Sequence, residues 1–253
     1  MKKHLYFIFF LSTGLVLAGC GAVFINQGSR DSAYAQNIAN PNFPPGNPIP
    51  EENRVIGDFE DGTKYMNPKL YGAGLGIWFT TSSGGNMPNF DFVAAGGAND
   101  TKNAAHVYGT LFDRGDGRYP ALILEGKFKN SGYYDLTPFQ GVRFYYKCPT
   151  DDRSSRRRFG FGIASTVAVA DGGVCREQCG NDYGATLPST NDWVEESFSF
   201  ADLKEEDNWG DQVNPPDFTD HLKEVVCIRW QNGSNNVPGV VPVDFWVDEV
   251  EFY

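Results

Sequence analysis

Histidine is scarce in this sequence, and the short motifs that mark common catalytic sites are missing from it. The 253 residues include 3 histidines, and no G-x-S-x-G elbow, H-E-x-x-H helix or phosphate-binding glycine loop occurs. Among the 32 acidic residues, no pair stands out as the two carboxylates that must flank a scissile bond. Glu195 and Glu196, for example, would point to opposite faces of a strand. We therefore predict that the protein is not an enzyme.

Basic residues are also few, with 21 Lys and Arg against 32 Asp and Glu and a formal net charge of −11. Nucleic-acid binding depends on neutralising phosphates with Lys and Arg, so nucleic acid is a poor partner for this chain. The one basic run, Arg156-Arg157-Arg158, follows Asp151 and Asp152. This composition predicts a solvated loop rather than a phosphate site.

The chain begins with "MKKHLYFIFFLSTGLVLAGC", in which two lysines precede an apolar stretch too short to span a bilayer comfortably. The segment ends in Leu-Ala-Gly-Cys at 17–20, which resembles the lipobox of bacterial lipoproteins. That resemblance implies cleavage after residue 19 and a lipid on the thiol of Cys20, so that the protein is anchored to a membrane. Gly21 rather than Asp follows the cysteine, which implies the outer membrane or the cell surface. A transmembrane anchor is the alternative.

Cysteine usage agrees with export. Once Cys20 carries a lipid, four cysteines remain: Cys148, Cys175, Cys179 and Cys227. An even number outside the cytoplasm predicts two disulfides, for which three connectivities are possible. The closely spaced Cys175 and Cys179 suit a small loop, and Cys148 and Cys227 would then bridge the body of the domain. Zinc is the alternative, but the histidines left, His106 and His221, lack finger-like spacing.

Long helical periodicity is missing from the rest of the chain. After the leader at 1–19, residues 20–54 form a lipidated N-terminus and a Pro/Asn-rich tether, which includes "NPNFPPGNPIPEEN". From 55 to 253 short apolar runs recur between Gly, Pro, Asn and Asp. We expect strands at 55–60, 104–112, 120–128, 141–148, 158–165, 193–200, 224–231 and 243–253. The predicted fold is a single all-β domain, a two-sheet antiparallel sandwich.

The last strand, "VDFWVDEVEFY", changes face part-way along. Phe245 and Val247 share one face, whereas Val250 and Phe252 share the other. The slip at Asp248-Glu249 predicts a β-bulge, which would turn a carboxylate towards the interior edge of the sandwich. A buried carboxylate needs hydrogen bonds or a cation. Calcium ligands are offered by the opening strand, "GDFEDG", through Asp58 and Glu60; the alternative is that these acids cap turns or face water.

Several segments taken in order resemble the calcium-containing jelly rolls of carbohydrate-binding modules, family eleven and its galactose-binding-like relatives above all. They are "IGDFEDG", "HVYG", "YYDLTPFQGVRFYYK", "WVEESFSFADL", "WG" and "FWVDEVEFY", which span most of 55–253. The resemblance implies a jelly roll with a structural calcium near the sandwich edge, with Glu60 and Asp248 on positions that match acidic ligands. It also implies binding of β-glucans on a concave face. The "CREQCGNDYG" insertion and the arginine run depart from the pattern and put the exact sugar in doubt.

A sugar groove needs exposed aromatic rings beside planar polar side chains. Alternation turns such pairs outward in three strands, and the cysteine-flanked loop offers a rim. The candidates are Arg143 with Tyr145, Asp244 with Trp246, Arg229 with Gln231, and Asp182 with Tyr183 at the rim. Trp193, Trp209 and Trp230 are expected in the core or at its edge, because Trp is usually largely buried. His106 shares a face with Tyr108 and is expected to be structural.

We therefore predict a lipid-anchored, calcium-stabilised jelly roll that binds polysaccharide, β-glucan first, without transforming it. Two other classes are open. One is a jelly-roll glycoside hydrolase or polysaccharide lyase. The other is a surface structural or assembly lipoprotein that binds a protein partner.

Overall fold

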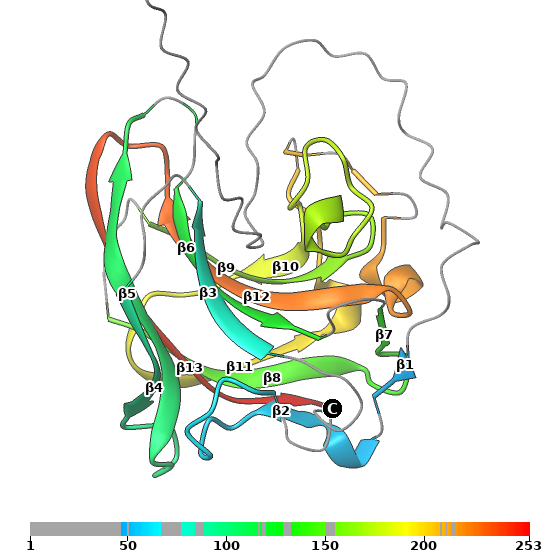
Figure 1. The fold of residues 1–253 in the computed structure, drawn as a ribbon, viewed down its shortest axis with the longest axis horizontal. Helices are drawn as coiled ribbons and strands as arrows, with labels where there is room; N and C mark the ends of the chain where they lie inside the picture. Colours follow the sequence, from blue (N-terminus) through cyan, green and yellow to red (C-terminus); the bar gives the residue numbers. More distant parts are fainter. Residues whose placement is uncertain are drawn as a thin grey trace, which may run out of the picture.

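The computed structural model describes residues 47–49, 51–66, 77–83, 89–115, 117, 120–128, 133–149, 155–207, 209–210, 212–213 and 216–253. These residues form two sheets packed face to face (Figure 1). The predicted all-β sandwich is confirmed. The predicted leader, its cleavage site and Cys20 lie outside the described residues, and so do Asp151 and Asp152. Among the described residues, no helix has the length and apolar character needed to cross a membrane.

Sheet A runs in the order β3-β6-β12-β9-β10, with β7 beside β12 and β1 beside β7. Its strands are β1 (Asn47–Pro48), β3 (Ile77–Ser83), β6 (Ala121–Lys127), β7 (Tyr134–Asp135), β9 (Ser155–Ile163), β10 (Tyr183–Thr186) and β12 (Val225–Ser234). Sheet B runs in the order β11-β8-β13-β5-β4, with β2 beside β13. Its strands are β2 (Val55–Gly57), β4 (Asn89–Ala95), β5 (Asn103–Asp113), β8 (Gly141–Cys148), β11 (Thr190–Ser199) and β13 (Gly239–Phe252).

The core lies between the two sheets and follows the predicted alternation. In β8, Val142, Phe144 and Tyr146 are buried, and their neighbours in sequence turn outward. The Phe144 ring packs against Phe159 of β9 at 4.9 Å and against Trp230 of β12 at 5.1 Å. Each such buried side chain contributes on the order of 2–3 kcal/mol through removal of apolar surface from water.

The terminal strand contains the predicted bulge. The register between β13 and β8 shifts between Asp248 and Glu251, and Glu249 has a φ of 47°. Because of the extra residue, Val247 and Val250 both reach the core, and Asp248 is buried with them at 0% exposure.

Three expectations about the chain's organisation were wrong. The packed domain begins before residue 55, since β1 pairs with β7 and Ile49 is 1% exposed. The arginine run lies in β9 instead of a loop. Strands β1, β3, β4, β7 and β10 were not predicted. The described residues also include short 3-10 turns, which are η1 (Glu51–Asn53), η2 (Val169–Asp171), η3 (Phe200–Asp202) and η4 (Phe218–His221).

Of the two predicted disulfides, the local one between Cys175 and Cys179 is present. Cys148 and Cys227 are both buried and do not bridge. The Cys148 thiol faces Asn232 on the core side of β12. Cys227 lies five residues earlier on that strand, about 16 Å away at the usual rise, and points to the other face.

Candidate functional site

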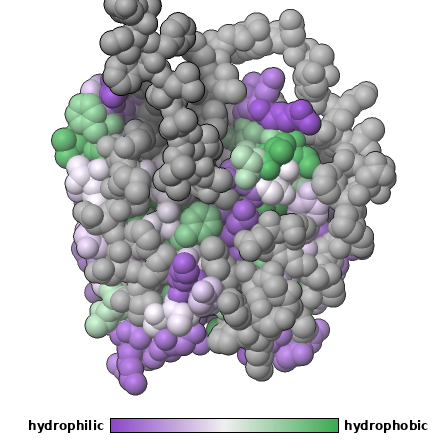
Figure 2. All heavy atoms as spheres, in the orientation of Figure 1, coloured by the Kyte–Doolittle hydropathy of each residue, from purple (hydrophilic) through white to green (hydrophobic). Residues whose placement is uncertain are grey.

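The predicted sugar-binding residues fall on two opposite faces of the sandwich. Arg229 and Gln231 lie on the outer face of sheet A, where the loop residue Asp182 joins them. The outer face of sheet B carries the others: Arg143, Tyr145, Asp244 and Trp246. Among the residues coloured in Figure 2, apolar and hydrophilic ones lie in small separate patches. These candidates therefore do not form one groove.

A hollow lies over sheet A, and its floor is built from two rows of side chains that cross the strands. In one row Ile123 of β6 lies opposite Gln231 of β12, which lies opposite Arg158 of β9. In the next row Glu125 lies opposite Arg229, which lies opposite Gly160. The odd-numbered residues of β6 and β12 face the hollow, because their even-numbered neighbours point into the core.

A buried ion network forms the centre of this floor. Arg229 donates from Nε to Oε2 of Glu125 at 2.8 Å and from Nη1 to Oδ2 of Asp182 at 2.7 Å. Burial alone would lower the pKa of Arg229, but the facing Asp182 carboxylate, with Cys227 and Glu125, raises it well above its ordinary value. The guanidinium therefore stays charged and holds both carboxylates in place.

One oxygen of this network is unsatisfied. Glu125 is 1% exposed, and its Oε1 has no hydrogen-bond partner among the described residues, although Oε2 is bound by Arg229. A buried polar atom without a partner costs about 1–3 kcal/mol. Glu125 is one of the residues that line the hollow.

The segment 164–182, which includes most of the CREQCGNDYG insertion at 175–184, forms one wall of the hollow. The 175–179 disulfide closes a loop within it. The segment folds back over two glycines of β9: a Cβ at Gly162 would lie 2.6 Å from Cγ2 of Val167, and one at Gly160 would lie 3.4 Å from Cβ of Asp182. The chain's own loop therefore covers the glycines on the outer face of β9.

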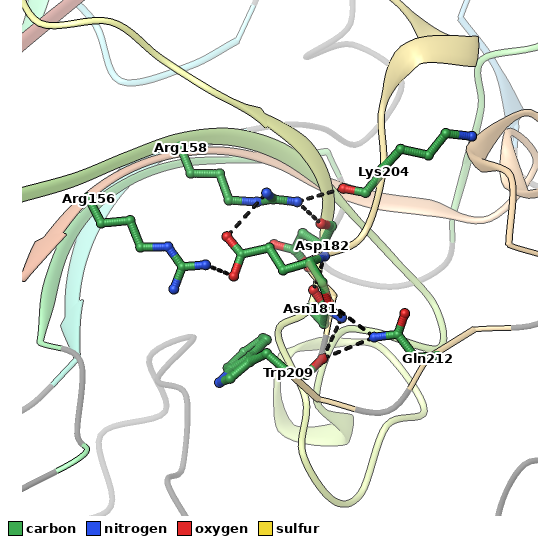
Figure 3. A network of polar contacts seen from close by, with 8 residues as sticks. Arg156, Arg158, Asn181, Asp182, Lys204, Trp209 and Gln212 are labelled. Atoms are coloured by element: carbon green, nitrogen blue, oxygen red, sulfur yellow. Dashed lines mark hydrogen bonds and ion pairs between the residues drawn. The ribbon is translucent and has the colours of Figure 1, made fainter. Parts of the chain in front are cut away.

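A second wall stands over the arginines of β9 (Figure 3). Glu206 pairs with Arg156 and with Nη1 of Arg158 at 3.1 Å. Arg158 also donates to the backbone carbonyl oxygens of Asp182 at 2.8 Å and of Lys204 at 2.6 Å. Burial lowers the pKa of Arg158 to about 10. Arg156 and Arg158, which the sequence assigned to a solvated loop, are thus held in ion pairs.

Asn181 joins the two walls. Its Nδ2 donates to the carbonyl oxygens of Glu206 at 3.1 Å and of Trp209 at 2.6 Å, and its Oδ1 accepts the Glu206 N–H at 2.8 Å. The half-buried Trp209 lines the hollow. Sequence analysis missed Asn181, Glu206 and Trp209 as site residues, because they lie in loops without periodicity.

The chain was compared with known proteins. No protein-family model matches the chain, and no curated protein matches it. Among solved structures, it is similar to the family 11 carbohydrate-binding module of the cellulosomal cellulase Lic26A-Cel5E of Clostridium thermocellum. The identity is 14%, the match covers 78% of this chain and 92% of that one, and the TM-score is 0.50. The fold is that of a carbohydrate-binding module.

Two further solved structures are similar, although with lower TM-scores. A family 11 module from Clostridium thermocellum, in complex with a β-1,3-1,4-mixed-linked tetrasaccharide, is 16% identical, with 69% of this chain and 87% of that chain covered and a TM-score of 0.47. A family 27 module from Caldicellulosiruptor saccharolyticus, in complex with mannohexaose, is 13% identical, with coverages of 78% and 93% and a TM-score of 0.43. At such identities the likeness concerns the fold alone.

Tyr183 does not lie at the position that the sequence predicted for it. This residue was expected at the rim of a sugar groove, but it is 0% exposed and packs in the core against Phe218 at 5.4 Å. The reason is its parity in β10, where it pairs with the buried Phe161 and therefore faces the other sheet. Only its neighbour Asp182 reaches the hollow.

On sheet B of the jelly roll, Trp246 is held in a stack that runs across three strands. It lies opposite His106 of β5 on one side and Lys147 of β8 on the other. The His106 ring stacks on it at 3.7 Å and 12°, and the Lys147 ammonium lies 4.4 Å from its centroid. Lys147 is also 4.8 Å from the Trp193 ring. Within the described residues both faces of Trp246 are occupied, so the predicted stacking on a sugar finds no support.

We expect Trp246→Ala to lower stability and to leave glycan affinity unchanged. The loss of one ring pair and one cation–π contact amounts to about 1–2 kcal/mol, which lowers Tm by roughly 2–8 °C for a domain of this size. Thermal melts and affinity electrophoresis on the same preparation measure both effects. Loss of glycan retardation in this variant without a change in Tm would show that Trp246 belongs to the binding site.

The other predicted residues on sheet B are engaged with their neighbours. Arg143 pairs with Glu251, and the Tyr145 hydroxyl donates to Oε2 of Glu195 at 3.1 Å. Asp244 lies 2.9 Å from Nε2 of His106 through its Oδ1. His106 is thus a partnered residue of the sheet surface, as expected.

The acids of the first and last strands meet at one loop, 96–103. Oδ2 of Asp248 accepts from the Ala98 N–H and from Oγ1 of Thr101, both at 2.8 Å. Oε1 of Glu60 accepts the N–H groups of Lys102 and Asn103, both at 2.8 Å. Strand β2 pairs with β13, which brings the two acids to the same end of sheet B.

Asp58, the third predicted metal ligand, is placed differently. Its Oδ1 accepts the Glu60 N–H at 3.3 Å, and it lines a groove with Arg143 and Tyr145 on sheet B. Within the described residues, no three His, Cys, Asp or Glu side chains gather closely enough to hold a metal ion. An ion held by Glu60 and Asp248 would need the loop's carbonyl oxygens as its other ligands.

Burial raises the pKa of Asp248 to about 6, although hydrogen bonds from Ala98, Thr101 and Glu249 oppose the shift. This carboxylate is therefore poorly stabilised as an anion by the protein alone. A bound cation beside it would favour the ionised form.

Proposed function

We propose that the protein binds polysaccharide in the hollow over sheet A and does not transform it. The observation that carries the proposal is the unsatisfied Oε1 of Glu125 on the floor of this hollow. Sugars offer many hydroxyl donors, and one hydroxyl would remove the cost of the buried acceptor.

The rest of the hollow suits a sugar as well. The half-buried Trp209 offers a ring for the C–H face of a pyranose, and the amide of Gln231 offers a planar donor and acceptor. Fixed ion pairs surround them, so little side-chain freedom is lost when a ligand binds. A concave site with few, well-placed polar groups is the usual form of a small-ligand site.

A neutral polysaccharide fits best. Each arginine of the hollow already faces a carboxylate: Arg229 faces Glu125 and Asp182, and Arg156 and Arg158 face Glu206. The acidic chain as a whole repels polyanionic glycans. The family-eleven resemblance makes β-glucan the first polymer to test.

The same ion pairs support binding without catalysis. Glycoside hydrolysis requires two carboxyl groups that flank the scissile bond. In this hollow Glu125, Asp182 and Glu206 are each held by an arginine.

We also propose a structural calcium ion at the 96–103 loop, with Glu60 and Asp248 as its carboxylate ligands. The support is that the Glu60 and Asp248 carboxylates meet at one segment of the chain and that Asp248 is buried. The ion would supply a positive charge beside Asp248. The lipobox-like sequence supports the further proposal of a lipid anchor on Cys20 at the outer membrane or cell surface.

The test uses affinity electrophoresis and calorimetry against a panel of neutral and acidic polysaccharides. We expect Trp209→Ala to lose about 2 kcal/mol of binding energy, roughly 30-fold in affinity. Trp193→Ala, a half-buried tryptophan on the opposite sheet, is the matched control and should bind as wild type. No retention by any neutral polymer, or equal losses in both variants, would contradict the proposal.

A further inference from the structure

We infer that the hollow takes the end of a glycan chain and not its interior, an inference that rests on the proposed polysaccharide binding. The reason is the way in which the chain's own residues stop both floor rows at β9. A linear polymer that lies across the strands of sheet A would follow these rows.

The first row ends under Glu206. It runs from Ile123 through Gln231 to Arg158, and Arg158 is capped by its ion pair with Glu206. Beyond it, Lys204 exchanges two backbone hydrogen bonds with Gly184 of β10, at 2.9 and 3.2 Å. The segment that carries Glu206 is therefore fixed over this edge of the sheet.

The second row ends under Asp182. It runs from Glu125 through Arg229 to Gly160, and the side chain of Asp182 lies directly over this glycine. The Asp182 carboxylate is bound by Arg229 and also accepts the Thr166 hydroxyl at 3.1 Å. A sugar unit cannot displace it without breaking a buried ion pair.

The hollow is also closed along the strands, towards the start of β12. There Val167 packs over Gly162 and, together with Ala164, Tyr133 and Val226, buries Cys227 in a second hydrophobic cluster. The segment 164–182 thus blocks two adjacent sides of the floor. A polymer that crosses the strands of sheet A from β6 therefore meets Glu206, Asn181 and Trp209 at the far side of the floor.

End walls of this kind recognise the hydroxyl that only a terminal sugar has. Glu206 offers carboxylate oxygens for it, while Arg156 and Arg158 offer N–H donors. Because these groups are paired with one another, the recognised end is uncharged.

The experiment titrates the wild-type protein with size fractions of linear β-1,3-1,4-glucan and of β-1,4-mannan in a calorimeter, at equal mass concentration. End recognition predicts that moles bound per gram rise in inverse proportion to mean chain length. A constant number of moles bound per gram would overturn the inference and leave polysaccharide binding intact. No heat with any fraction of either polymer would overturn both.

Two variants locate the end wall. Glu206→Ala should weaken binding to the shortest fraction by about tenfold or more, and Glu206→Gln, which keeps the shape of the side chain, should weaken it less. Glu52→Ala, an exposed residue of η1, is the matched control and should bind as wild type. If both Glu206 variants keep their melting curves and bind as wild type, the inference fails.

Discussion

Arg229→Ala is expected to lower the free energy of unfolding by about 3–5 kcal/mol. The substitution removes the only cation that the structure shows for Glu125, whose side chain is 1% exposed, and leaves Asp182 without its ion pair. Two carboxylates would then be buried near each other without the cation that pairs with both of them. Since a domain of this kind has about 5–15 kcal/mol of total stability, the variant should be near the limit of folding. Urea denaturation followed by tryptophan fluorescence measures the change.

Two controls separate this cause from simple loss of packing. Arg143→Ala breaks an ion pair with Glu251 on the outer face of sheet B, where the Arg143 side chain is 45% exposed, and should cost less than about 1 kcal/mol. Neutralising the partners in the triple variant Arg229→Met, Glu125→Gln and Asp182→Asn should recover most of the lost stability. A loss below about 1 kcal/mol in Arg229→Ala would show that both carboxylates reach water.

The second large effect is expected at Asp248, where calcium should reverse the dependence of stability on pH. Without the ion, the pKa of this carboxyl is about 6 in the folded protein and 3.8 as its ordinary value. The contribution of the Asp248 carboxyl to the free energy of unfolding is therefore fully present below pH 4 and is lost as pH rises through 6. The reason is that the folded protein holds the carboxyl proton more tightly than the unfolded chain does. Ionising Asp248 in the folded protein then costs about 3 kcal/mol.

With calcium bound, the ion replaces the proton. Ligand carboxylates must be ionised, so the stabilisation by calcium should increase with pH over this same interval. We expect a free-energy gain of about 3–4 kcal/mol at pH 7 when free calcium exceeds its dissociation constant by 100- to 1,000-fold. Melting curves at pH 4, 5, 6 and 7, in EDTA and in calcium, measure the effect.

Asp248→Asn is the control that assigns the effect to this residue. The variant should lose the difference in pH slope between EDTA and calcium, while the contributions of other carboxyls stay in both curves. Melting curves of wild type that are the same in EDTA and in calcium at pH 7 would remove the ion from the proposal. A pH slope in EDTA that is equal in wild type and variant would show that Asp248 does not titrate between 4 and 6.

Alternation predicts which side chains of a strand turn outward, but it does not identify most of the loop residues that line the hollow. Arg229 and Gln231 were found because alternation in β12 turns them outward from the buried Trp230. Glu125 lies in a strand that was also predicted, but an acid on an outward face is usually solvated, so nothing in the sequence marked it. Asn181, Glu206 and Trp209 come from loops whose conformation depends on the disulfide, the ion pairs with β9 and the Lys204–Gly184 bridge.

The choice between the two outer faces was not available from periodicity. Alternation predicts that the side chains of Trp246 and Arg229 both turn away from the core. It does not predict which side chains of the neighbouring strands lie beside them. The stack of Trp246 between His106 and Lys147 requires that β5 and β8 both pair with β13. Strand order is a property of the assembled sheets. It placed neighbouring side chains against Trp246, and it placed Arg229 at the centre of the floor of the hollow.

The sequence by itself determined the all-β class, the buried faces of β8, β9 and β13 and the bulge at Asp248, and it favoured the local disulfide, because each depends on residues within a few positions of one another. The tertiary structure alone decided that Arg229 meets Glu125 and Asp182, which are 104 and 47 positions away. The tertiary structure also decided that the segment 164–182 forms a wall of the hollow and that Cys148 and Cys227 stay apart. These outcomes depend on which strands become neighbours, and contacts between distant segments leave no period in the sequence.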